Sequence, residues 1–296
     1  MVDSFLREYP WQRFKEFISP NADRFKILKE LLHEAALEYT VLDIAGNHHL
    51  VIAPHPPEEG YVRRKPVILV AHHDRAAGSP GANDNSAAVF ILLETAIKLK
   101  RENAFNWVII FTDKEELKEG ESILDQGSYA LAEGLKNAKM EKARIFCFDA
   151  CGAGDTLIIS NTLEYLLKKE GGGDKIRESI MELRMLALDT ARNLGMKKVL
   201  LSPTPFSDDA GFFRAGLAAQ TITVLPAAEC LQLVSELRKN QEFAEVLISA
   251  ESRRNYRSKA IPDTWRYVNT AGDSYLRLSA QHFRTWMRFA EALCKS

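Results

Sequence analysis

Short apolar runs alternate with amphipathic segments along most of this chain. The runs cover residues 40–44, 50–53, 66–71, 106–111, 143–148, 155–160, 199–201 and 220–224, and their lengths predict strands. Residues 66–71 contain no polar side chain, which is typical of a central strand that is covered on both faces. Helices are predicted over residues 5–37, 86–99, 128–136 and 175–194, and over a last segment from Ser279 that places its apolar residues on one face.

This alternation of strands and helices predicts an α/β fold with a mostly parallel sheet. We expect a three-layer sandwich in which a mixed β-sheet carries helices on both faces. Residues 54–64 contain three prolines and a glycine and predict a turn between two strands. No repeat, low-complexity tract or linker is evident, so we expect residues 1–296 to form a single domain.

Composition narrows the class of protein. Of the 296 residues, 46% are hydrophobic and 27% are charged, with a net charge of -1, which suits a globular protein and argues against nucleic-acid binding. No apolar stretch approaches the roughly 20 residues of a membrane-spanning helix, and the first residues lack the features of a signal peptide. The four cysteines form no CxxC pair, so we expect free thiols and a cytoplasmic location. The oligomeric state stays open.

Acidic and histidine residues follow the central predicted strands. His72, His73 and Asp74 follow the run 66–71, residues 113–116 follow the next run, and Asp149 follows the run 143–148. Each of these signals has an ordinary explanation. A histidine at a strand end is commonly a hydrogen-bonded polar residue, and a Glu-Glu pair is commonly a solvated helix start. Asp84 could simply belong to a turn beside a helix cap.

Taken together, the same residues predict a metal site. The carboxyl ends of parallel strands meet at one edge of a sheet, where several carboxylates would repel one another and raise their own pKa values. A divalent cation removes this repulsion. One histidine with several carboxylates suits zinc, manganese or cobalt in a hydrolytic site.

The order of the motifs resembles that of the co-catalytic di-zinc aminopeptidases, within the superfamily that also contains the glutaminyl cyclases. The matching motifs are Ala71-His72-His73-Asp74, Gly81-Ala82-Asn83-Asp84-Asn85, Glu115-Glu116, Phe148-Asp149, Ser207-Asp208 and Asn269-Thr270-Ala271-Gly272-Asp273. The similarity runs from about Val67 to the end of the chain. It implies a zinc-exopeptidase fold of the phosphorylase/hydrolase-like kind, a peptide or amino-acid-derivative substrate, and one or two zinc ions.

The resemblance also implies residue roles. The metal ligands would be His72, Asp84, Glu116, Asp149 and Asn269. Asp84 would bridge two ions, Asp74 would orient the ring of His72, and Glu115 would act as the general base that activates the attacking water. The family keeps a cis peptide bond after the bridging aspartate, which we expect here between Asp84 and Asn85.

Three departures from the family pattern matter. Asn269 stands where the family has its last histidine ligand, and an amide is a poorer zinc ligand than imidazole, so we expect the position of Asp84, Glu116 and Asn269 to be weakened. Asp209 follows Ser207-Asp208, where many relatives have histidine. Residues 117–126 form an enlarged loop that we expect to border the substrate pocket. His73 is interpreted as a polar rim residue that faces away from the site, and Cys151 as a plain buried or rim thiol.

Three functions remain open on these residues. The first is a metal-dependent exopeptidase, most simply an aminopeptidase, that hydrolyses a terminal peptide bond. The second is a catalytically weakened family member that binds peptides or a partner, for which Asn269 is the main support. The third is a glutaminyl cyclase-like acyltransferase, which we rank lower because Asn269 removes the histidine that such a site would use.

Overall fold

All eight runs predicted as strands form strands, and they join one mixed sheet. The computed structural model describes residues 5–55, 65–170, 173–240, 242–256 and 260–296. The strands are β1 (Thr40–Ile44), β2 (Asn47–Ile52), β3 (Val67–His72), β4 (Trp107–Thr112), β5 (Arg144–Phe148), β6 (Thr156–Ser160), β7 (Val199–Ser202) and β8 (Ala219–Leu225). The turn predicted over residues 54–64 lies almost entirely outside the described residues.

The strand order is β1-β2-β4-β3-β5-β8-β6-β7. The centre is parallel, because β3 pairs in parallel with β4 and with β5, and β8 pairs in parallel with β5. At one edge β2 runs antiparallel to both β1 and β4, and toward the other edge β6 runs antiparallel to β8. The sheet is therefore mixed with a parallel centre, as the sequence predicts.

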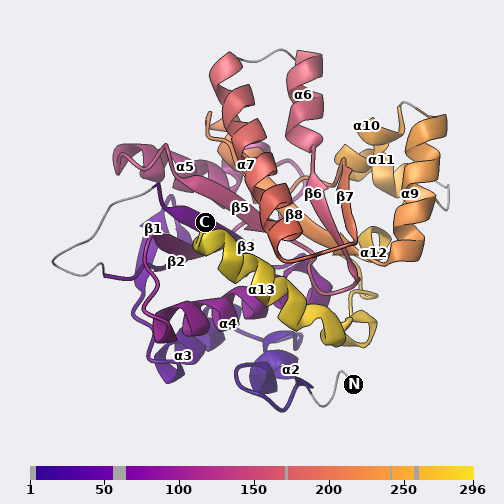
Figure 1. Cartoon of the computed structure of the whole chain (residues 1–296). Helices are drawn as coiled ribbons and strands as arrows, with labels where there is room; N and C mark the ends of the chain where they lie inside the picture. The colour runs from indigo at the N-terminus through magenta and orange to yellow at the C-terminus, as the bar shows by residue number, and fades with distance from the viewer. Residues whose placement is uncertain (1–4, 56–64, 171–172, 241, 257–259) are drawn as a thin grey trace.

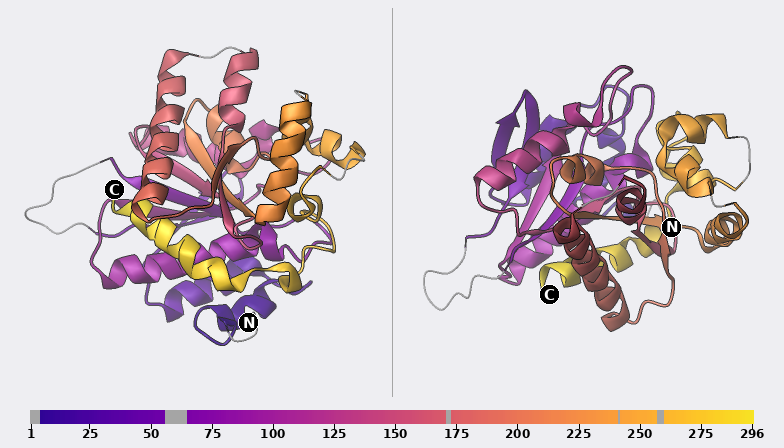
Figure 2. Two further views of the ribbon diagram at one scale, coloured as in Figure 1. Left: turned by 45° about the vertical axis from the view of Figure 1, so that its right-hand side comes forward. Right: turned by 90° about the horizontal axis from the view of Figure 1, so that it is seen from above.

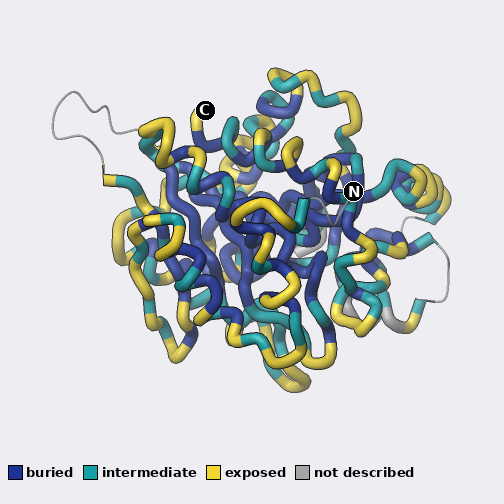
Figure 3. Tube along the Cα trace, turned by 90° about the horizontal axis from the view of Figure 1, so that it is seen from below, coloured by how far each residue is buried: buried dark blue, intermediate teal, exposed yellow. Residues whose placement is uncertain are grey.

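Helices lie on both faces of this sheet (Figures 1 and 2). The main helices are α2 (Phe14–Phe17), α3 (Arg24–Glu34), α4 (Ala88–Arg101), α5 (Gly127–Asn137), α6 (Thr162–Glu170), α7 (Asp174–Asn193), α8 (Asp208–Arg214), α9 (Ala227–Lys239), α10 (Phe243–Ile248), α11 (Ala250–Asn255), α12 (Asp263–Arg266) and α13 (Phe283–Cys294). Alternate side chains of β3 enter different cores: Leu69 packs with α4 and α13, and Val70 packs with α5 and α8. Figure 3 shows these strands as a buried centre within a more exposed shell. The three-layer sandwich is confirmed.

Residues 5–37, predicted to be helical, form separate helical pieces with a break between them. A 3-10 turn at Trp11–Arg13 leads into α2, the chain then breaks, and α3 begins only at Arg24. Pro20 lies in the break and lacks the N–H that a continuous helix needs, and the side chain of Asp23 caps α3 by accepting a hydrogen bond from the Lys26 N–H at 2.9 Å. This break folds the N-terminal segment back over the core.

A second departure is the helical segment from residue 227 to residue 266, which the apolar pattern does not reveal. Helices α9 to α12 follow β8 and pack around Leu225 and Ile158, with Phe243 and Trp265 in the same cluster. Figure 1 shows this segment in orange beside the C-terminal half of the sheet. It forms one wall of the cavity described below.

Candidate active site

The three central parallel strands end at the same edge of the sheet. His72 is the last residue of β3 and pairs with Thr112, the last residue of β4. Asp149 directly follows β5 on the other side of β3. The register of the sheet thus brings to one edge three chain segments that are far apart in the sequence.

The imidazole of His72 lies at the centre of this group and is fully buried. Its Nε2 atom is 3.0 Å from Asp84 Oδ1, 3.9 Å from Asp149 Oδ1 and 4.0 Å from Glu115 Oε2. Its Nδ1 atom is 3.4 Å from Asp74 Oδ1 on the opposite side of the ring. The ligand-type atoms of His72, Asp84 and Asp149 all lie within 4.8 Å of one another, which is compatible with a shared ion.

Asp84 lies in the segment Ala82–Ala87 that precedes α4, at a kink where its backbone leaves helical geometry (φ -110°, ψ 90°). The Asp84–Asn85 peptide bond is cis, so that prediction is confirmed. Two oxygens of Asp273 hold the turn: Oδ1 accepts a hydrogen bond from the Asn83 N–H at 2.8 Å, and Oδ2 accepts one from the Asp84 N–H at 3.0 Å. The Asn85 side-chain amide donates to the Phe148 carbonyl at 2.7 Å, which ties the turn to β5.

Asp74 contacts both His72 and the loop after β4. Its two oxygens accept hydrogen bonds from the backbone N–H groups of Glu115 (3.2 Å) and Glu116 (3.0 Å). The loop turns at Lys114, which has a left-handed φ of 58°. A side chain at Gly127 could not fit, because a Cβ atom there would lie 1.9 Å from the Asp113 carbonyl oxygen. These contacts fix the direction in which the two glutamates leave the loop.

Glu115 and Glu116 point to different partners, as their neighbouring positions predict. Oε1 of Glu115 lies 3.2 Å from the Gln126 side-chain amide nitrogen, which donates to it, and Oε2 faces His72. Gln126 is 4% exposed and belongs to the enlarged loop, which borders the cavity as predicted. No spacing signal in the sequence identified Gln126 as a partner of the glutamate.

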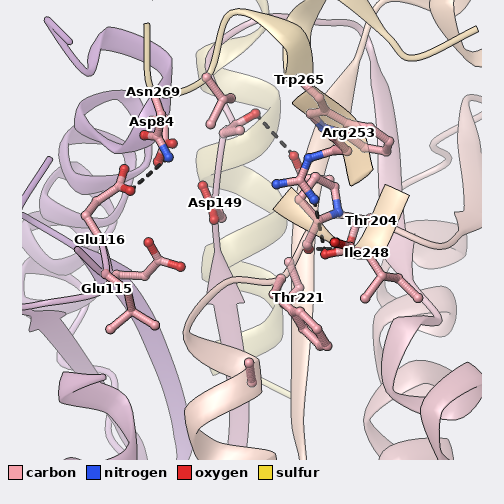
Figure 4. A pocket seen from close by; sticks show the side chains of 18 of the residues that line it. Asp84, Glu115, Glu116, Asp149, Thr204, Thr221, Ile248, Arg253, Trp265 and Asn269 are labelled. Carbon is pink, nitrogen blue, oxygen red and sulfur yellow. Dashed lines mark hydrogen bonds between the residues drawn. The ribbon is translucent and has the colours of Figure 1, made fainter. Parts of the chain in front are cut away.

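Asn269 meets Glu116 at the rim of the cavity. Its amide nitrogen donates a hydrogen bond to Glu116 Oε2 at 2.8 Å (Figure 4). This contact offers a hydrogen-bond donor in the place where a metal ligand would offer a lone pair. The ligand role of Asn269 and the weakened second metal position both stay predictions.

The electrostatics of this cluster fit a cation. Burial, and next the negative charge of Asp84, raise the pKa of Asp149 to about 7 and that of Glu116 to about 9. Burial also raises the pKa of Glu115 well above its usual value. Burial alone would lower the pKa of His72, but Asp74 and Asp84 outweigh it and raise that pKa well above 6.5. A cation among these side chains would relieve the repulsion between the buried carboxylates.

Four buried atoms of this group make no hydrogen bond of good geometry: His72 Nδ1, His72 Nε2, Asp84 Oδ1 and Glu116 Oε1. This holds although His72 Nε2 and Asp84 Oδ1 lie only 3.0 Å apart. Buried polar atoms without partners are rare in proteins and call for an explanation such as an ion. Nitrogen and carboxylate oxygen are ligand atoms that zinc accepts. The residues present thus fit a divalent metal.

A cavity of about 500 Å³ opens beside these side chains. Figure 4 shows Glu115, Glu116 and Asp84 on one side of the cavity and Asp149 in the middle. The helices after β8 contribute to the opposite side, together with Thr204 and Thr221. Arg253, Trp265 and Ile248 belong to that second wall. Sequence reasoning missed all three, because none lies in a motif and the helices that carry them were not predicted.

Other residues singled out from the sequence lie outside the cluster. His73 faces away, as predicted, and its Nε2 is 3.0 Å from the His48 carbonyl oxygen, but it is only 4% exposed and so is not a rim residue. Cys151 is a buried thiol that donates to the Ile222 carbonyl oxygen at 3.3 Å, in agreement with its plain interpretation. All four cysteines are unpaired.

The two aspartates after Ser207 are buried behind the site. Thr112 Oγ1 donates to Asp208 Oδ2 at 2.7 Å, and the Ser207 N–H donates to Asp209 Oδ1 at 3.0 Å. Burial raises the pKa of each to about 6. Asp209 therefore accepts a hydrogen bond at the N-terminal end of α8, and no contact between Asp209 and His72 is seen among the described residues.

Sequence analysis also did not identify Arg24 as a residue that contacts the active-site loops. Its buried guanidinium donates to backbone carbonyls of three separate segments, including those of Asp74 (3.0 Å) and Pro80 (2.7 Å). Burial lowers the pKa of Arg24 to about 9. Within an amphipathic helix this arginine gives no local signal that it reaches the active-site loops.

A mixed eight-stranded sandwich with a histidine-carboxylate cluster at its central strand ends is the arrangement of the zinc-exopeptidase class. The chain belongs to peptidase family M28, whose sequence model matches residues 51–293. This membership supports a metal-dependent hydrolase. A search of curated proteins gave no match.

Solved structures share the fold at low sequence identity. A zinc aminopeptidase from Bacillus subtilis is 18% identical with a TM-score of 0.52, over 83% of this chain and 48% of that one, so this chain spans about half its length. The LapA aminopeptidase of Legionella pneumophila is 15% identical with a TM-score of 0.61, over 99% and 72% of the two chains. A glutaminyl cyclase from Bacteroides thetaiotaomicron, bound to N-acetylhistamine, is 16% identical with a TM-score of 0.65, over 99% and 97%.

Among the described residues, no helix is both long and apolar enough to cross a membrane.

Proposed function

We propose that the chain is a metal-dependent exopeptidase, and specifically an aminopeptidase, that releases the terminal residue of a peptide. The observation that carries this proposal is the convergence of His72, Asp84 and Asp149, with Glu115 Oε2 only 4.0 Å from His72 Nε2. A hydrolase that activates water needs a metal ion beside a carboxylate that can accept a proton. Here that carboxylate is Glu115, and Gln126 holds its other oxygen.

His72, Asp84 and Asp149 would hold the tightly bound ion, for which zinc is our first choice and manganese or cobalt the alternatives. When bound, the ion would polarise the scissile carbonyl and lower the pKa of water toward about 7.

The protein side chains supply the remaining steps. Glu115 would accept the proton of the attacking water at Oε2 and pass it to the leaving amine, while Gln126 holds Oε1. Asp74 would keep the His72 ring in position from its Nδ1 side and hold the glutamate loop through two backbone N–H groups.

A second ion would use Asp84, Glu116 and Asn269, and we propose that it binds weakly. The Asn269 amide presents an N–H group to Glu116, and an amide oxygen in its place would still be a poorer zinc ligand than imidazole. Elemental analysis after dialysis should find closer to one firmly held metal ion per chain than two. Two tightly held zinc ions would contradict the weakened position.

A screen of aminoacyl reporter substrates tests the activity itself. The full-length protein should hydrolyse at least one of them after incubation with zinc, manganese or cobalt, and should lose the activity in chelator. If no reporter and no free peptide is cleaved under any metal, the aminopeptidase proposal fails. A family member that only binds peptides would give that result while still retaining peptide in a binding assay.

Glutaminyl cyclase activity is the second candidate, because the similarity to the Bacteroides thetaiotaomicron enzyme covers nearly the whole length of both chains. It ranks lower because Asn269 stands at the position of the last histidine. Incubation with a peptide that begins with glutamine separates the two: cyclisation releases ammonia and keeps the peptide bond, whereas aminopeptidase action releases free glutamine.

A further inference from the structure

A smaller apolar pocket adjoins the active-site cavity, and we call it the side pocket. It has a volume of about 340 Å³ and is lined by five large apolar side chains, those of Ile123, Leu124, Leu166, Phe206 and Phe213. Ile123 and Phe206 also line the active-site cavity. The two spaces are therefore neighbours that share part of their walls.

One wall of the side pocket comes from the enlarged loop, residues 117–126. Ile123 and Leu124 lie in a 3-10 turn that is held by Asp125, whose Oδ2 accepts hydrogen bonds from the Ser122 N–H at 2.9 Å and from the Ser122 hydroxyl at 3.0 Å. Leu124 is 53% exposed, and neither it nor Ile123 belongs to an apolar core cluster in the part of the chain that the structure describes. The turn thus holds two apolar side chains in place that the core does not use.

The opposite wall is anchored in the protein interior. Leu166 of α6, Phe206 and Phe213 of α8 pack against a buried apolar cluster that α6 and α7 form. Each of these three side chains is partly exposed. This wall is formed before any ligand binds, so an occupant would bury apolar surface without having to order the protein first.

The character of the lining selects the occupant. The active-site cavity contains four carboxylates, whereas the side pocket has none among its described lining residues, and its one charged residue is Arg214. Arg214 would repel a basic side chain. The apolar walls offer few hydrogen-bond partners to a polar side chain, which would lose its water without compensation. A large apolar side chain gains most from leaving water here.

The position of the side pocket identifies which residue of a peptide reaches it. The residue whose carbonyl reacts has to lie beside Glu115 and the predicted metal ligands, in the larger cavity of about 500 Å³. Gln126, which donates to Glu115 Oε1 at 3.2 Å, belongs to the same loop as Ile123 and Leu124. A peptide that extends from Glu115 along this loop therefore brings its next residue to the side pocket.

We propose that the side pocket binds a large apolar side chain, such as leucine or phenylalanine, at the second residue of a peptide substrate, and that Leu124 determines this preference. The inference rests on the proposed aminopeptidase function for the identity of the ligand and for the position of the reacting bond. Selective binding at the side pocket can be measured without turnover.

The test uses the zinc-loaded full chain with Glu115→Gln, in which the peptide is not consumed. Calorimetry would compare Ala-Leu-Ala, Ala-Phe-Ala and Leu-Ala-Ala with Ala-Ala-Ala as the common reference. Ala-Leu-Ala should bind about 5- to 50-fold more tightly than the reference, because it buries three more carbon atoms in an apolar pocket. Leu-Ala-Ala places its leucine in the larger cavity, so its affinity should not depend on Leu124.

A further substitution, Leu124→Ser, should reduce the preference for Ala-Leu-Ala by about 3- to 10-fold, since it removes part of the apolar wall. Leu124→Met should keep most of the preference, because methionine is apolar and similar in volume. Both variants should fold, since Leu124 is exposed. The matched control is Leu231→Ser, which removes an exposed leucine of α9 that lines neither space and should have no effect.

Equal binding of Ala-Leu-Ala and Ala-Ala-Ala would overturn the proposal, as would a preference that Leu124→Ser leaves unchanged or that Leu231→Ser also reduces. A dependence on Leu124 that is confined to the first residue, or no measurable binding of any peptide, would overturn it as well.

Turnover of the same peptides by the chain with Glu115 intact separates this result from failure of the proposed function. Binding that prefers an apolar second residue, without hydrolysis, would leave the side pocket in its role and reject the peptidase. Hydrolysis with no preference at the second residue would do the reverse.

Discussion

The substitution Glu115→Gln should separate catalysis from metal binding. Glutamine keeps the shape of the side chain, and its carbonyl oxygen can still accept the hydrogen bond that Gln126 now gives to Oε1 at 3.2 Å. The amide cannot take a proton from water. The change therefore removes the proposed base and leaves the loop in place.

The size of the effect follows from the role. A positioned general base contributes typically about 100- to 10,000-fold to a rate, so kcat should fall by that factor. Metal content should stay unchanged, because His72, Asp84 and Asp149 are intact. Burial already holds the pKa of Glu115 well above its usual value, so a neutral amide suits the metal-free fold and should not lower its thermal stability.

The assay is steady-state hydrolysis of the best reporter substrate, with metal content determined on the same samples. Glu119→Gln is the matched control, since Glu119 is an exposed glutamate of the same loop, and it should leave both measurements unchanged. Full activity in the Glu115 variant would refute the base assignment. Loss of bound metal would show that Glu115 acts as a ligand.

Three further outcomes are expected. Asn269→His should raise metal occupancy toward two ions per chain, and unchanged metal affinity would place residue 269 outside the metal site. Asp273→Asn keeps only one acceptor oxygen for the N–H groups of Asn83 and Asp84, so it should cost about 1.5–3 kcal/mol of stability and lower metal affinity about 10- to 100-fold, as thermal denaturation and metal titration would show. Burial raises the pKa of Asp149 to about 7, so with the metal removed by chelator this group binds more protons in the folded chain than in the unfolded one. Stability should therefore fall as pH rises from about 4 through 7. A denaturation temperature that rises over that range would contradict this.

The central part of the fold, and the convergence of His72, Asp84 and Asp149, were predictable from sequence. Val67–His72 is an uninterrupted apolar strand that ends in ligand-type residues, and its neighbours β4 and β5 show the same pattern. Parallel pairing then places those ends together. The cis bond after Asp84 was predictable only from the resemblance, because nothing in the local pattern signals it.

The second wall of the cavity could not be predicted in this way. Arg253 and Trp265 belong to short helices whose apolar residues show no long period, and their approach to the site depends on packing against Leu225. Gln126 reaches Glu115 only because the enlarged loop folds back over the sheet edge. In each case the contact joins segments that are far apart or irregularly placed in the sequence, so no helix or strand periodicity predicts it.

The break within the predicted helical segment 5–37 was missed for a related reason. Apolar residues from Trp11 to Leu32 follow helical spacing on both sides of Pro20, and the pattern alone does not show that the two halves pack in different directions. The buried aromatic residues Trp11, Phe14 and Phe17 pack together with Phe90 of α4. Tertiary packing, which a single sequence does not display, decided the course of this segment.

The hydrogen bonds of Arg24 have a practical consequence for anyone who prepares this protein. Arg24 lies before the region that the family model matches, yet it donates hydrogen bonds to the Asp74 and Pro80 carbonyls in the loop that follows His72. A deletion that starts at the family boundary would therefore remove these hydrogen bonds, although all the residues predicted to bind metal would remain in the chain. Affinity tags and fusion partners are accordingly safer after α13 than in place of the residues that lead into α3.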